Sequence, residues 1–233
     1  MRILPIRAAW IGCVVAVLLL FGAAAQADSG EPFGLATVPA QGSLAATWRT
    51  LQARMKAERP VIARCRAAAL ACGSIPALQF IAIVDEGNGF TGLARIGRIN
   101  RAVNFAIRAV EVGAPGAARD DWTSPLQTLA AGEGDCKQYA VLKYAALQAA
   151  GFAADDLRIV IIERRTGLAV HAVVAVRNDG RWLILDNRVL TIVDSRKLLD
   201  HYRPLYTLGR RGVRQFVPRS PRTAQKSGAA CAG

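Results

Sequence analysis

The chain has 233 residues, which is enough for one domain of ordinary size with a hydrophobic core. Its composition, 52% hydrophobic and 20% charged, excludes a wholly disordered chain. The formal net charge of +13 would suit an anionic partner, but no nucleic-acid recognition motif accompanies it. The sequence therefore predicts no nucleic-acid partner.

The first 27 residues have the pattern of a secretory signal peptide. Arg2 and Arg7 form a basic start, an apolar run covers residues 11–25, and Ala25-Gln26-Ala27 offers a small-x-small cleavage site. The run is shorter than the roughly twenty apolar residues that a membrane span needs. An uncleaved anchor is the alternative. We expect an exported protein that begins at Asp28 and keeps no stable membrane span after cleavage.

Export also bears on the cysteines, of which Cys65 and Cys72 lie seven residues apart. In an oxidising compartment a local disulfide between them is plausible. One continuous helix would hold the two residues about 10 Å apart, too far for a bridge. We therefore predict a Cys65–Cys72 disulfide and a helix that ends between the two cysteines, as Gly73-Ser74 nearby would allow. The remaining mature cysteines are Cys136 and Cys231.

Apolar periodicity predicts a helical first half and a sheet in the second half. Residues 28–44 read as a flexible leader, and residues 209–233 as a basic disordered tail. Between them, 45–208 is expected to form one α+β domain. The expected helices cover residues 45–71, with a start or kink at Pro60, and then 75–85, 93–107, 125–131 and 136–150. The expected strands cover residues 157–163, 169–176 and 182–185, as an antiparallel sheet.

Cys136 opens the last of these helices. Asp135 is a good N-cap residue, and Gln138 three positions later can complete a capping box. The thiol then lies in the first helical turn, where the helix dipole and Lys137 favour the thiolate, while Asp135 opposes both. Gly134 would let the backbone approach a substrate closely, and the Cys136 amide could help to bind an oxyanion. An inert core cysteine is the alternative interpretation.

Two later residues can serve this cysteine. His171 and Asp186 lie in the strands on either side of a strong hairpin signal centred on Asp179-Gly180. If those two residues form the turn, Val173 faces Asp186 and His171 is its diagonal neighbour; if Asn178-Asp179 turns instead, His171 lies directly opposite. Both registers place the two side chains on one face, about 5–8 Å apart at Cβ. A three-residue bulged loop would break this parity.

A cysteine at a helix start, a histidine strand and an aspartate strand fit the logic of nucleophile, base and orienting group. We predict the catalytic residues Cys136, His171 and Asp186. The alternatives are a half-buried histidine and an aspartate that only forms a turn. His201 has no comparable partner pattern, and we expect it at the surface.

These residues and their flanks resemble the bacterial transglutaminase-like cysteine peptidases, a branch of the papain-like and transglutaminase superfamily. The resemblance covers roughly residues 45–208 and includes Asn100-Arg101-Ala102-Val103-Asn104, Trp122-Thr123-Ser124-Pro125-Leu126, Gly134-Asp135-Cys136, Tyr139-Ala140, Lys143-Tyr144, His171-Ala172-Val173 and Leu185-Asp186-Asn187. It implies N-terminal helices, a cysteine-bearing helix packed on an antiparallel sheet, and a triad at Cys136, His171 and Asp186. It also implies a periplasmic protein whose protein substrate is a surface adhesin and whose partner is an inner-membrane regulatory receptor.

One difference from the family pattern concerns metal binding. In the adhesin-releasing branch the motif resembles Gly-Asp-Cys-Glu-Asp, and the acids beside the cysteine bind calcium. Lys137 and Gln138 take those two places here, which leaves Asp135 as a weak calcium candidate. A lysine cannot ligate a hard cation that prefers several oxygens. The sequence therefore predicts no cofactor and no metal site.

The expected activity is that of an exported thiol hydrolase that cleaves a peptide bond. Two alternatives keep the same fold. The triad could transfer an acyl group to an amine, as transglutaminases do, or the domain could be a non-catalytic binding module.

Overall fold

The computed structural model describes residues 30–110, 122–167 and 170–217. The predicted signal peptide and Cys231 lie outside the described residues. The helices are α1 Ser43–Ala67, α2 Ile75–Asp85, α3 Gly92–Ala106, α4 Pro125–Ala131 and α5 Cys136–Ala149, with short 3-10 segments η1 Pro32–Gly34, η2 Ala69–Ala71, η3 Ala154–Asp156 and η4 Ser195–Leu198. The strands are β1 Thr37–Pro39, β2 Arg108–Ala109, β3 Glu133–Gly134, β4 Leu157–Arg164, β5 Val170–Asn178, β6 Arg181–Leu185, β7 Val193–Asp194, β8 Tyr202–Gly209 and β9 Gly212–Phe216.

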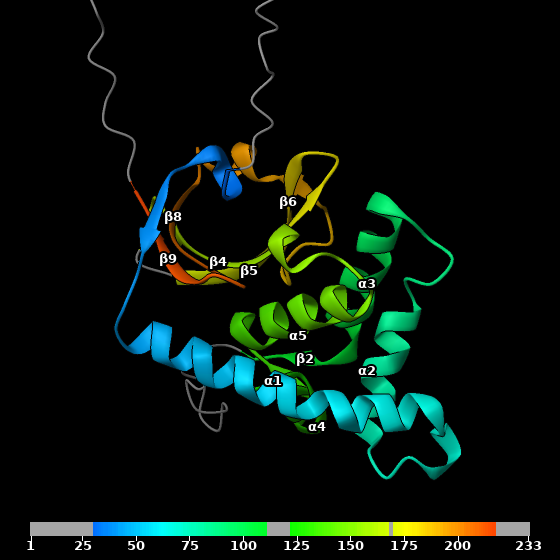
Figure 1. Ribbon diagram of the computed structural model, residues 1–233. Coiled ribbons are helices and arrows are strands. Elements are labelled where there is room, and N and C mark those ends of the chain that lie inside the picture. Colours follow the sequence, from blue (N-terminus) through cyan, green and yellow to red (C-terminus); the bar gives the residue numbers. More distant parts are fainter. Residues whose placement is uncertain (1–29, 111–121, 168–169, 218–233) are drawn as a thin grey trace, which may run out of the picture.

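The predicted α+β class and the order of helices before sheet are confirmed. Within the described residues, seven strands form one antiparallel sheet in the order β1-β9-β8-β4-β5-β6-β7, and β2 pairs with β3 in a small parallel ladder. Figure 1 shows the curved sheet above α5, with α1 below this helix and α2 and α3 to one side. The cysteine helix is therefore enclosed between the sheet and the other helices.

The predicted disulfide is also present. α1 runs through Pro60 as one helix and ends at Ala67, so that Cys65 lies in its last turn. η2 then turns the chain back and brings the Cα atoms of Cys65 and Cys72 to 4.7 Å. The helix ends between the two cysteines, as the geometry of a disulfide requires.

The main core fills the space between the helices and one face of the sheet. Trp48 of α1 is buried, and its indole ring meets the ring of Tyr144 on α5 edge to face, with the centroids 5.5 Å apart. The indole N–H of Trp48 donates to the carbonyl of Gly209, 3.0 Å away, at the end of β8. One buried aromatic side chain thus joins the first helix, the cysteine helix and the sheet.

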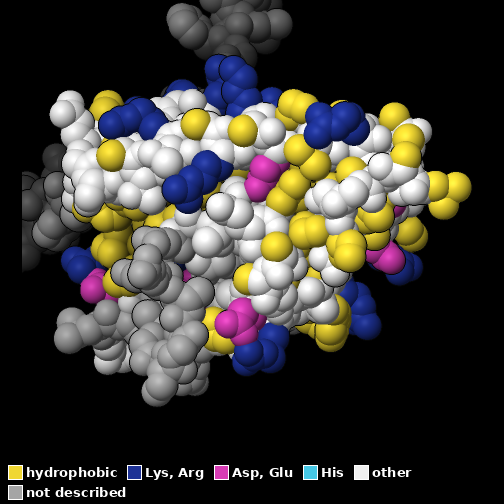
Figure 2. Space-filling view, turned by 90° about the horizontal axis from the view of Figure 1, so that it is seen from below, with side chains coloured by type: hydrophobic (Ala, Val, Ile, Leu, Met, Phe, Trp, Pro, Cys, Tyr) yellow, Lys and Arg dark blue, Asp and Glu magenta, His cyan; other side chains and the backbone are white. Residues whose placement is uncertain are grey.

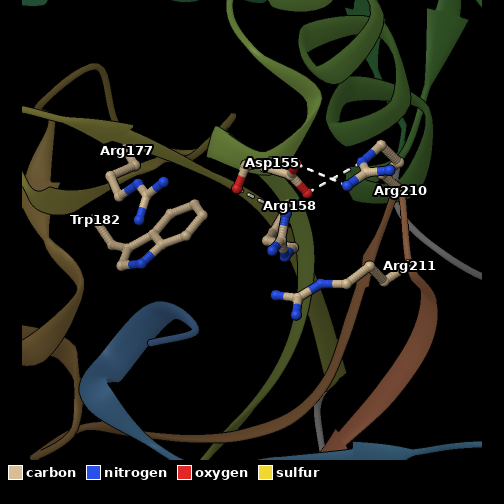
Figure 3. A pocket seen from close by; sticks show the side chains of 6 residues that line it. All are labelled: Asp155, Arg158, Arg177, Trp182, Arg210 and Arg211. Atoms are coloured by element: carbon tan, nitrogen blue, oxygen red, sulfur yellow. Dashed lines mark hydrogen bonds and ion pairs between the residues drawn. The ribbon is translucent and has the colours of Figure 1, made fainter. Parts of the chain in front are cut away.

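A second, smaller cluster covers the other face of the sheet and includes Phe33 and Trp182. Beside it lies a hollow of about 250 Å³, lined by four arginines, one aspartate and Trp182, which Figure 3 labels as Asp155, Arg158, Arg177, Trp182, Arg210 and Arg211. Arg158 is buried and forms a two-pronged ion pair with Glu31, at 2.7 Å and 3.2 Å. The arginines of this hollow are paired with acids, so the network fastens chain segments that are distant in sequence.

The expected flexible leader at residues 28–44 is wrong for its described part. Glu31 pairs with Arg158 and Arg211, and Phe33 is buried against Phe216 in an edge-to-face contact. β1 then pairs with β9 at the edge of the sheet. The Gly- and Pro-rich composition suggested flexibility, but three specific side-chain and backbone contacts hold this segment to the sheet.

The expected disordered tail from residue 209 starts too early. Gly209 ends β8, and β9 adds a strand in which Val213 and Phe216 are buried. Arg210 pairs with Asp155, and Arg214 donates to the hydroxyl and carbonyl of Thr37. The basic residues looked solvated in sequence because their partners lie far away along the chain. Residues 218–233 lie outside the described ranges.

Figure 2 shows the molecule from below, where Lys and Arg side chains are scattered over the face among apolar groups and several lie beside Asp or Glu side chains. No helix among the described residues has the length and apolar character needed to cross a membrane.

The Glu31–Arg158 pair gives a test of this architecture. Glu31→Gln keeps the size of the side chain but leaves the buried Arg158 guanidinium without its counter-charge. We expect a loss of about 3–5 kcal/mol in the free energy of unfolding, measured by urea denaturation. Glu163→Gln is the matched control, because Glu163 pairs with the exposed Arg203, and its loss should stay below about 1 kcal/mol. Equal losses in the two variants would contradict a supporting role for Glu31.

Candidate active site

The start of α5 is built by the predicted capping box. The Asp135 carboxylate accepts the backbone N–H of Lys137 at 2.8 Å, and its second oxygen accepts the Lys137 ammonium at 2.7 Å. Gln138 reaches back and accepts the backbone N–H of Asp135 at 3.1 Å. These bonds fix the entry of the chain into the helix and place Cys136 in its first turn.

Gly132 and Gly134, which precede the cysteine, each occupy a position that favours glycine. Gly132 ends α4 with φ of 67°, a left-handed conformation that favours glycine. A Cβ on Gly134 would lie 2.5 Å from the Cβ of Gln138. Gly134 therefore leaves room for the capping side chain, which is a different reason from the close substrate approach expected from sequence.

Two further contacts hold this turn in place. The hydroxyl of Tyr139, one turn into α5, donates to the carbonyl of Ile107 at 2.7 Å. β2 and β3 pair just before Cys136, with Arg108 opposite Glu133 and an ion pair between their side chains. The segment that carries the thiol is thus held both by its own helix and by the chain after α3.

The hairpin that carries the other two predicted residues has the first of the two proposed registers. Val174 pairs with Leu185, and Asn178 pairs with Arg181. Asp179 and Gly180 form the two-residue turn with φ of 49° and 75°, the conformation that this Asp-Gly sequence favours. The parity argument for His171 and Asp186 therefore holds.

His171 and Asp186 are in direct contact. Nε2 of His171 lies 2.8 Å from Oδ1 of Asp186. Since an ionised carboxylate only accepts hydrogen bonds, Nε2 carries the proton and donates it. The same Oδ1 accepts the backbone N–H of Arg188 at 2.9 Å, and the Asp186 carbonyl accepts from Nδ2 of Asn104 at 3.2 Å. Both the side chain and the backbone of Asp186 are fixed.

Cys136 is the third member of this group. It is a half-buried free thiol, and it interacts with the imidazole of His171. The second ring nitrogen, Nδ1, has no partner of full hydrogen-bond geometry among the described residues.

The electrostatics favour a thiolate–imidazolium pair. Burial raises the pKa of the Cys136 thiol, but His171 and the backbone N–H of Ala172 together bring that pKa below its usual 9.0. Burial lowers the pKa of His171, but the Asp186 carboxylate and Cys136 outweigh it and raise the pKa to about 9. Burial likewise raises the pKa of Asp186, and its bond to His171 leads the effects that hold it below the usual value. A lowered thiol pKa is the property that a cysteine nucleophile needs.

The structure thus brings together all three residues predicted as catalytic, and it leaves His201 exposed, as expected. Sequence reasoning assigned no role to Asn104 or to Lys143, a buried residue of α5. Both belong to motifs that carried the family resemblance. The signal that could have identified Lys143 is its spacing, because seven residues place it two helical turns after Cys136 on the same face.

Comparison with known proteins identifies the group to which this arrangement is related. A family model described as bacterial transglutaminase-like cysteine proteinase BTLCP matches residues 64–202. No curated protein matches the chain.

Three solved structures of LapG from Legionella pneumophila share the fold. One is 23% identical, with a TM-score of 0.55, and the match covers 66% of this chain and 87% of LapG. A calcium-bound form is 22% identical, with a TM-score of 0.56 and coverage of 72% and 93%. An EGTA-treated form is 23% identical, with a TM-score of 0.57 and coverage of 69% and 88%. At these identities the likeness shows the fold.

The calcium-bound and EGTA-treated LapG structures also correct the prediction that no cofactor is involved, because they indicate calcium binding among proteins of this kind. The residues beside Cys136 do not by themselves make a calcium site. Both carboxylate oxygens of Asp135 are bonded to Lys137, and no group of three or more His, Cys, Asp or Glu side chains gathers within the described ranges. Glu111, Asp120 and Asp121 lie outside those ranges.

The reactivity of the thiol tests the site directly. We expect iodoacetamide to alkylate Cys136 near pH 7 at least about tenfold faster than free cysteine, because the neighbouring imidazolium favours the thiolate. His171→Ala should remove this enhancement and move thiolate formation to higher pH. The rate is followed at the Cys136 peptide by mass spectrometry, and His201→Ala serves as the control. Unchanged reactivity in His171→Ala would contradict the pair.

Proposed function

This chain belongs to the bacterial transglutaminase-like cysteine proteinase family, and we propose that it is an exported peptidase that cleaves a protein substrate with Cys136, His171 and Asp186. As a member of this family it is a cysteine peptidase of the transglutaminase-like type. The roles of the three residues, the compartment and the substrate are the parts that we add.

The observation that carries the proposal is the hydrogen bond between His171 and Asp186, together with the influence of this imidazole on the half-buried Cys136 thiol at the start of α5. Asp186 accepts a hydrogen bond from the Nε2–H group of His171, with Nε2 and Oδ1 2.8 Å apart. Nδ1 is therefore the ring nitrogen that can exchange a proton with the Cys136 sulfur. The half-buried carboxylate of Asp186 fixes the ring orientation and stabilises the imidazolium. Nucleophile, base and orienting group thus lie together.

In the first half of the proposed reaction, the Cys136 thiolate attacks the carbonyl carbon of the scissile peptide bond and forms a tetrahedral oxyanion. The backbone N–H of Cys136 is one of the first amides of α5, which have no partner within the helix and can donate to this oxygen. When the intermediate collapses, the C–N bond breaks and the imidazolium of His171 gives its proton to the leaving amine. The products are a free amine and a thioester on Cys136.

In the second half, neutral His171 accepts a proton from a water molecule as the water oxygen attacks the thioester carbonyl. The C–S bond then breaks, a carboxylic acid leaves, and the thiolate–imidazolium pair is restored. The same intermediate would give acyl transfer if an amine attacked instead of water. The triad alone is compatible with both outcomes.

Two observations support export to the periplasm. The N-terminal sequence has the features of a signal peptide, and the disulfide between Cys65 and Cys72 suits an oxidising compartment. The family resemblance suggests a surface adhesin as the protein substrate and an inner-membrane receptor as a regulatory partner. Sequencing the N-terminus of the secreted protein tests cleavage before Asp28.

Substitution of Cys136 tests its role as the nucleophile. Cys136→Ala should abolish cleavage while the thermal unfolding midpoint stays close to that of the wild type, because the site is half-buried and loses only one sulfur atom. Comparing the surface proteins that cells shed with and without this variant identifies the substrate, with calcium and with EGTA as separate conditions. His201→Ala is the control that should shed normally. Normal turnover of a proven substrate by Cys136→Ala would refute the triad.

Adding a primary amine to the reaction separates hydrolysis from acyl transfer. With an added primary amine, we expect the released carboxyl ends to carry water-derived oxygen and no amide, as in a peptidase. Mass spectrometry in ¹⁸O-labelled water measures both products. Predominant amide formation would establish the transglutaminase reaction instead.

The pH dependence follows from the pKa of His171. The reactive pair requires a deprotonated thiol and a protonated imidazole, so kcat/KM should fall as the pH rises through about 9, where His171 loses its proton. A profile measured with the identified substrate checks this basic limb. Activity that stays constant well above that pH would contradict a protonated His171 in the reactive form.

A further inference from the structure

Lys143 is a buried cation that the proposed reaction does not use. Its side chain is 1% exposed, and Nζ has no hydrogen-bond partner among the described residues. It lies on α5 between Leu142 and Tyr144, both buried in the main core. A buried ammonium without a partner is destabilising, since burial removes the hydration of the charge.

Lys143 is linked to Asp186 by packing and by charge: α5 packs against β5 and against α3, which carries Asn104, and the Asp186 carboxylate opposes the fall that burial causes in the pKa of Lys143. Asn104 donates to the carbonyl of Asp186. The Oδ1 atoms of Asn100, of Asn104 and of Asn187, which follows Asp186 in sequence, are buried without partners in the part of the chain that the structure describes. Asn100 and Asn104 belong to α3, which packs against α5. The backbone of Asp186 is therefore bonded to a helix that packs against the helix carrying Lys143.

We propose that Lys143 is a positioning residue, whose buried charge on α5 helps to hold the Asp186 side chain in the orientation in which it accepts the hydrogen bond from His171. This inference rests on the proposed function, because it assigns Lys143 a role through the triad. Lys143 does not touch the reacting atoms. It acts on Asp186, which in turn orients the imidazole that serves Cys136.

A purely structural role for Lys143 accounts poorly for these observations. Within the described ranges the ammonium makes no hydrogen bond that would offset its desolvation, and an apolar side chain of the same length would fill the same space. Replacement of a poorly compensated buried charge by an apolar residue is often neutral or stabilising. Residues that reduce stability and yet serve an active site are a known consequence of selection for function.

The electrostatic directions agree with this role. Burial raises the pKa of Asp186, while Lys143 is among the groups that lower it. Burial lowers the pKa of Lys143 to about 7, and Asp186 opposes that shift. The other titratable side chains on α5 and on the elements packed against it are Cys136, Lys137, Tyr139, Tyr144, Asp85, Arg95, Arg98, Arg101, Glu133, Arg158, Glu163, Arg164, His171 and Arg177.

The test is Lys143→Met, which removes the charge and keeps the length of the side chain. We expect alkylation of Cys136 by iodoacetamide to slow by about tenfold at pH 6, below the depressed pKa of about 7 at which Lys143 loses its charge. The acid limb of the alkylation profile should move to higher pH, because Asp186 takes up a proton more readily without the neighbouring cation. Tyr144→Phe, which removes a buried polar atom from the next position of α5, is the matched control and should react like the wild type.

The thermal stability of the Lys143→Met variant distinguishes a positioning role of Lys143 from a structural one. A lysine whose folded-state pKa is depressed destabilises the fold most when the pH lies below that pKa, and the effect disappears above the ordinary value of 10.5. The thermal unfolding midpoint of Lys143→Met should therefore equal or exceed that of the wild type. The gain in the midpoint should be larger below pH 7 than near pH 10.5. A lower midpoint together with lost reactivity would overturn the proposal in favour of a structural role.

A double-mutant cycle tests whether Lys143 acts through Asp186. In an Asp186→Asn background, Lys143→Met should cause no further loss of Cys136 alkylation. An undiminished tenfold loss in that background, or wild-type reactivity of the single Lys143→Met variant, would overturn the inference. If wild-type Cys136 were no more reactive than free cysteine, the proposed function itself would fail, so the two failures are distinguishable.

Discussion

The contact between His171 and Asp186 is the interaction on which the arrangement of the site depends. Its 2.8 Å hydrogen bond links the start of β5 to the end of β6, and the backbone of Asp186 is tied to α3 through Asn104. Cys136 approaches this pair from the capped start of α5. Sheet, α3 and α5 therefore meet at a few polar atoms, and each must be correctly placed for the imidazole to influence the thiol.

The parts of this site that could be predicted from sequence are those governed by local rules. Asp179-Gly180 specifies a two-residue turn, and such a turn sets the register that places His171 and Asp186 on one face. Asp135 and Gln138 are three residues apart, so a capping box can be recognised without the fold. Even the disulfide followed from a local argument about where α1 must end. The triad was therefore predictable as geometry, while its chemical roles are a proposal.

Contacts between distant segments were not predictable in the same way. The segment after Gly30 and the strand after Gly209 each looked flexible by composition, yet β1 and β9 pair with each other at one edge of the sheet. Neither strand shows its partner in its own sequence. The metal prediction failed for a related reason, since it used only the residues beside Cys136, whereas LapG, which shares this fold, has a calcium-bound structure.

Two buried cations, Arg158 and Lys143, differ in how far their charges are compensated by hydrogen bonds. Arg158 lies under the far face of the sheet with every guanidinium nitrogen bonded, to Glu31 and to the carbonyls of Ala154, Asp155 and Leu157, so its charge is compensated where it lies. Lys143 lies in the core beneath the triad, and its ammonium has no hydrogen bond to any described residue. A satisfied buried pair can hold a fold together, whereas an unsatisfied cation lowers stability unless it acts on something else. The charge within its reach is Asp186, the carboxylate that orients the imidazole of the proposed triad.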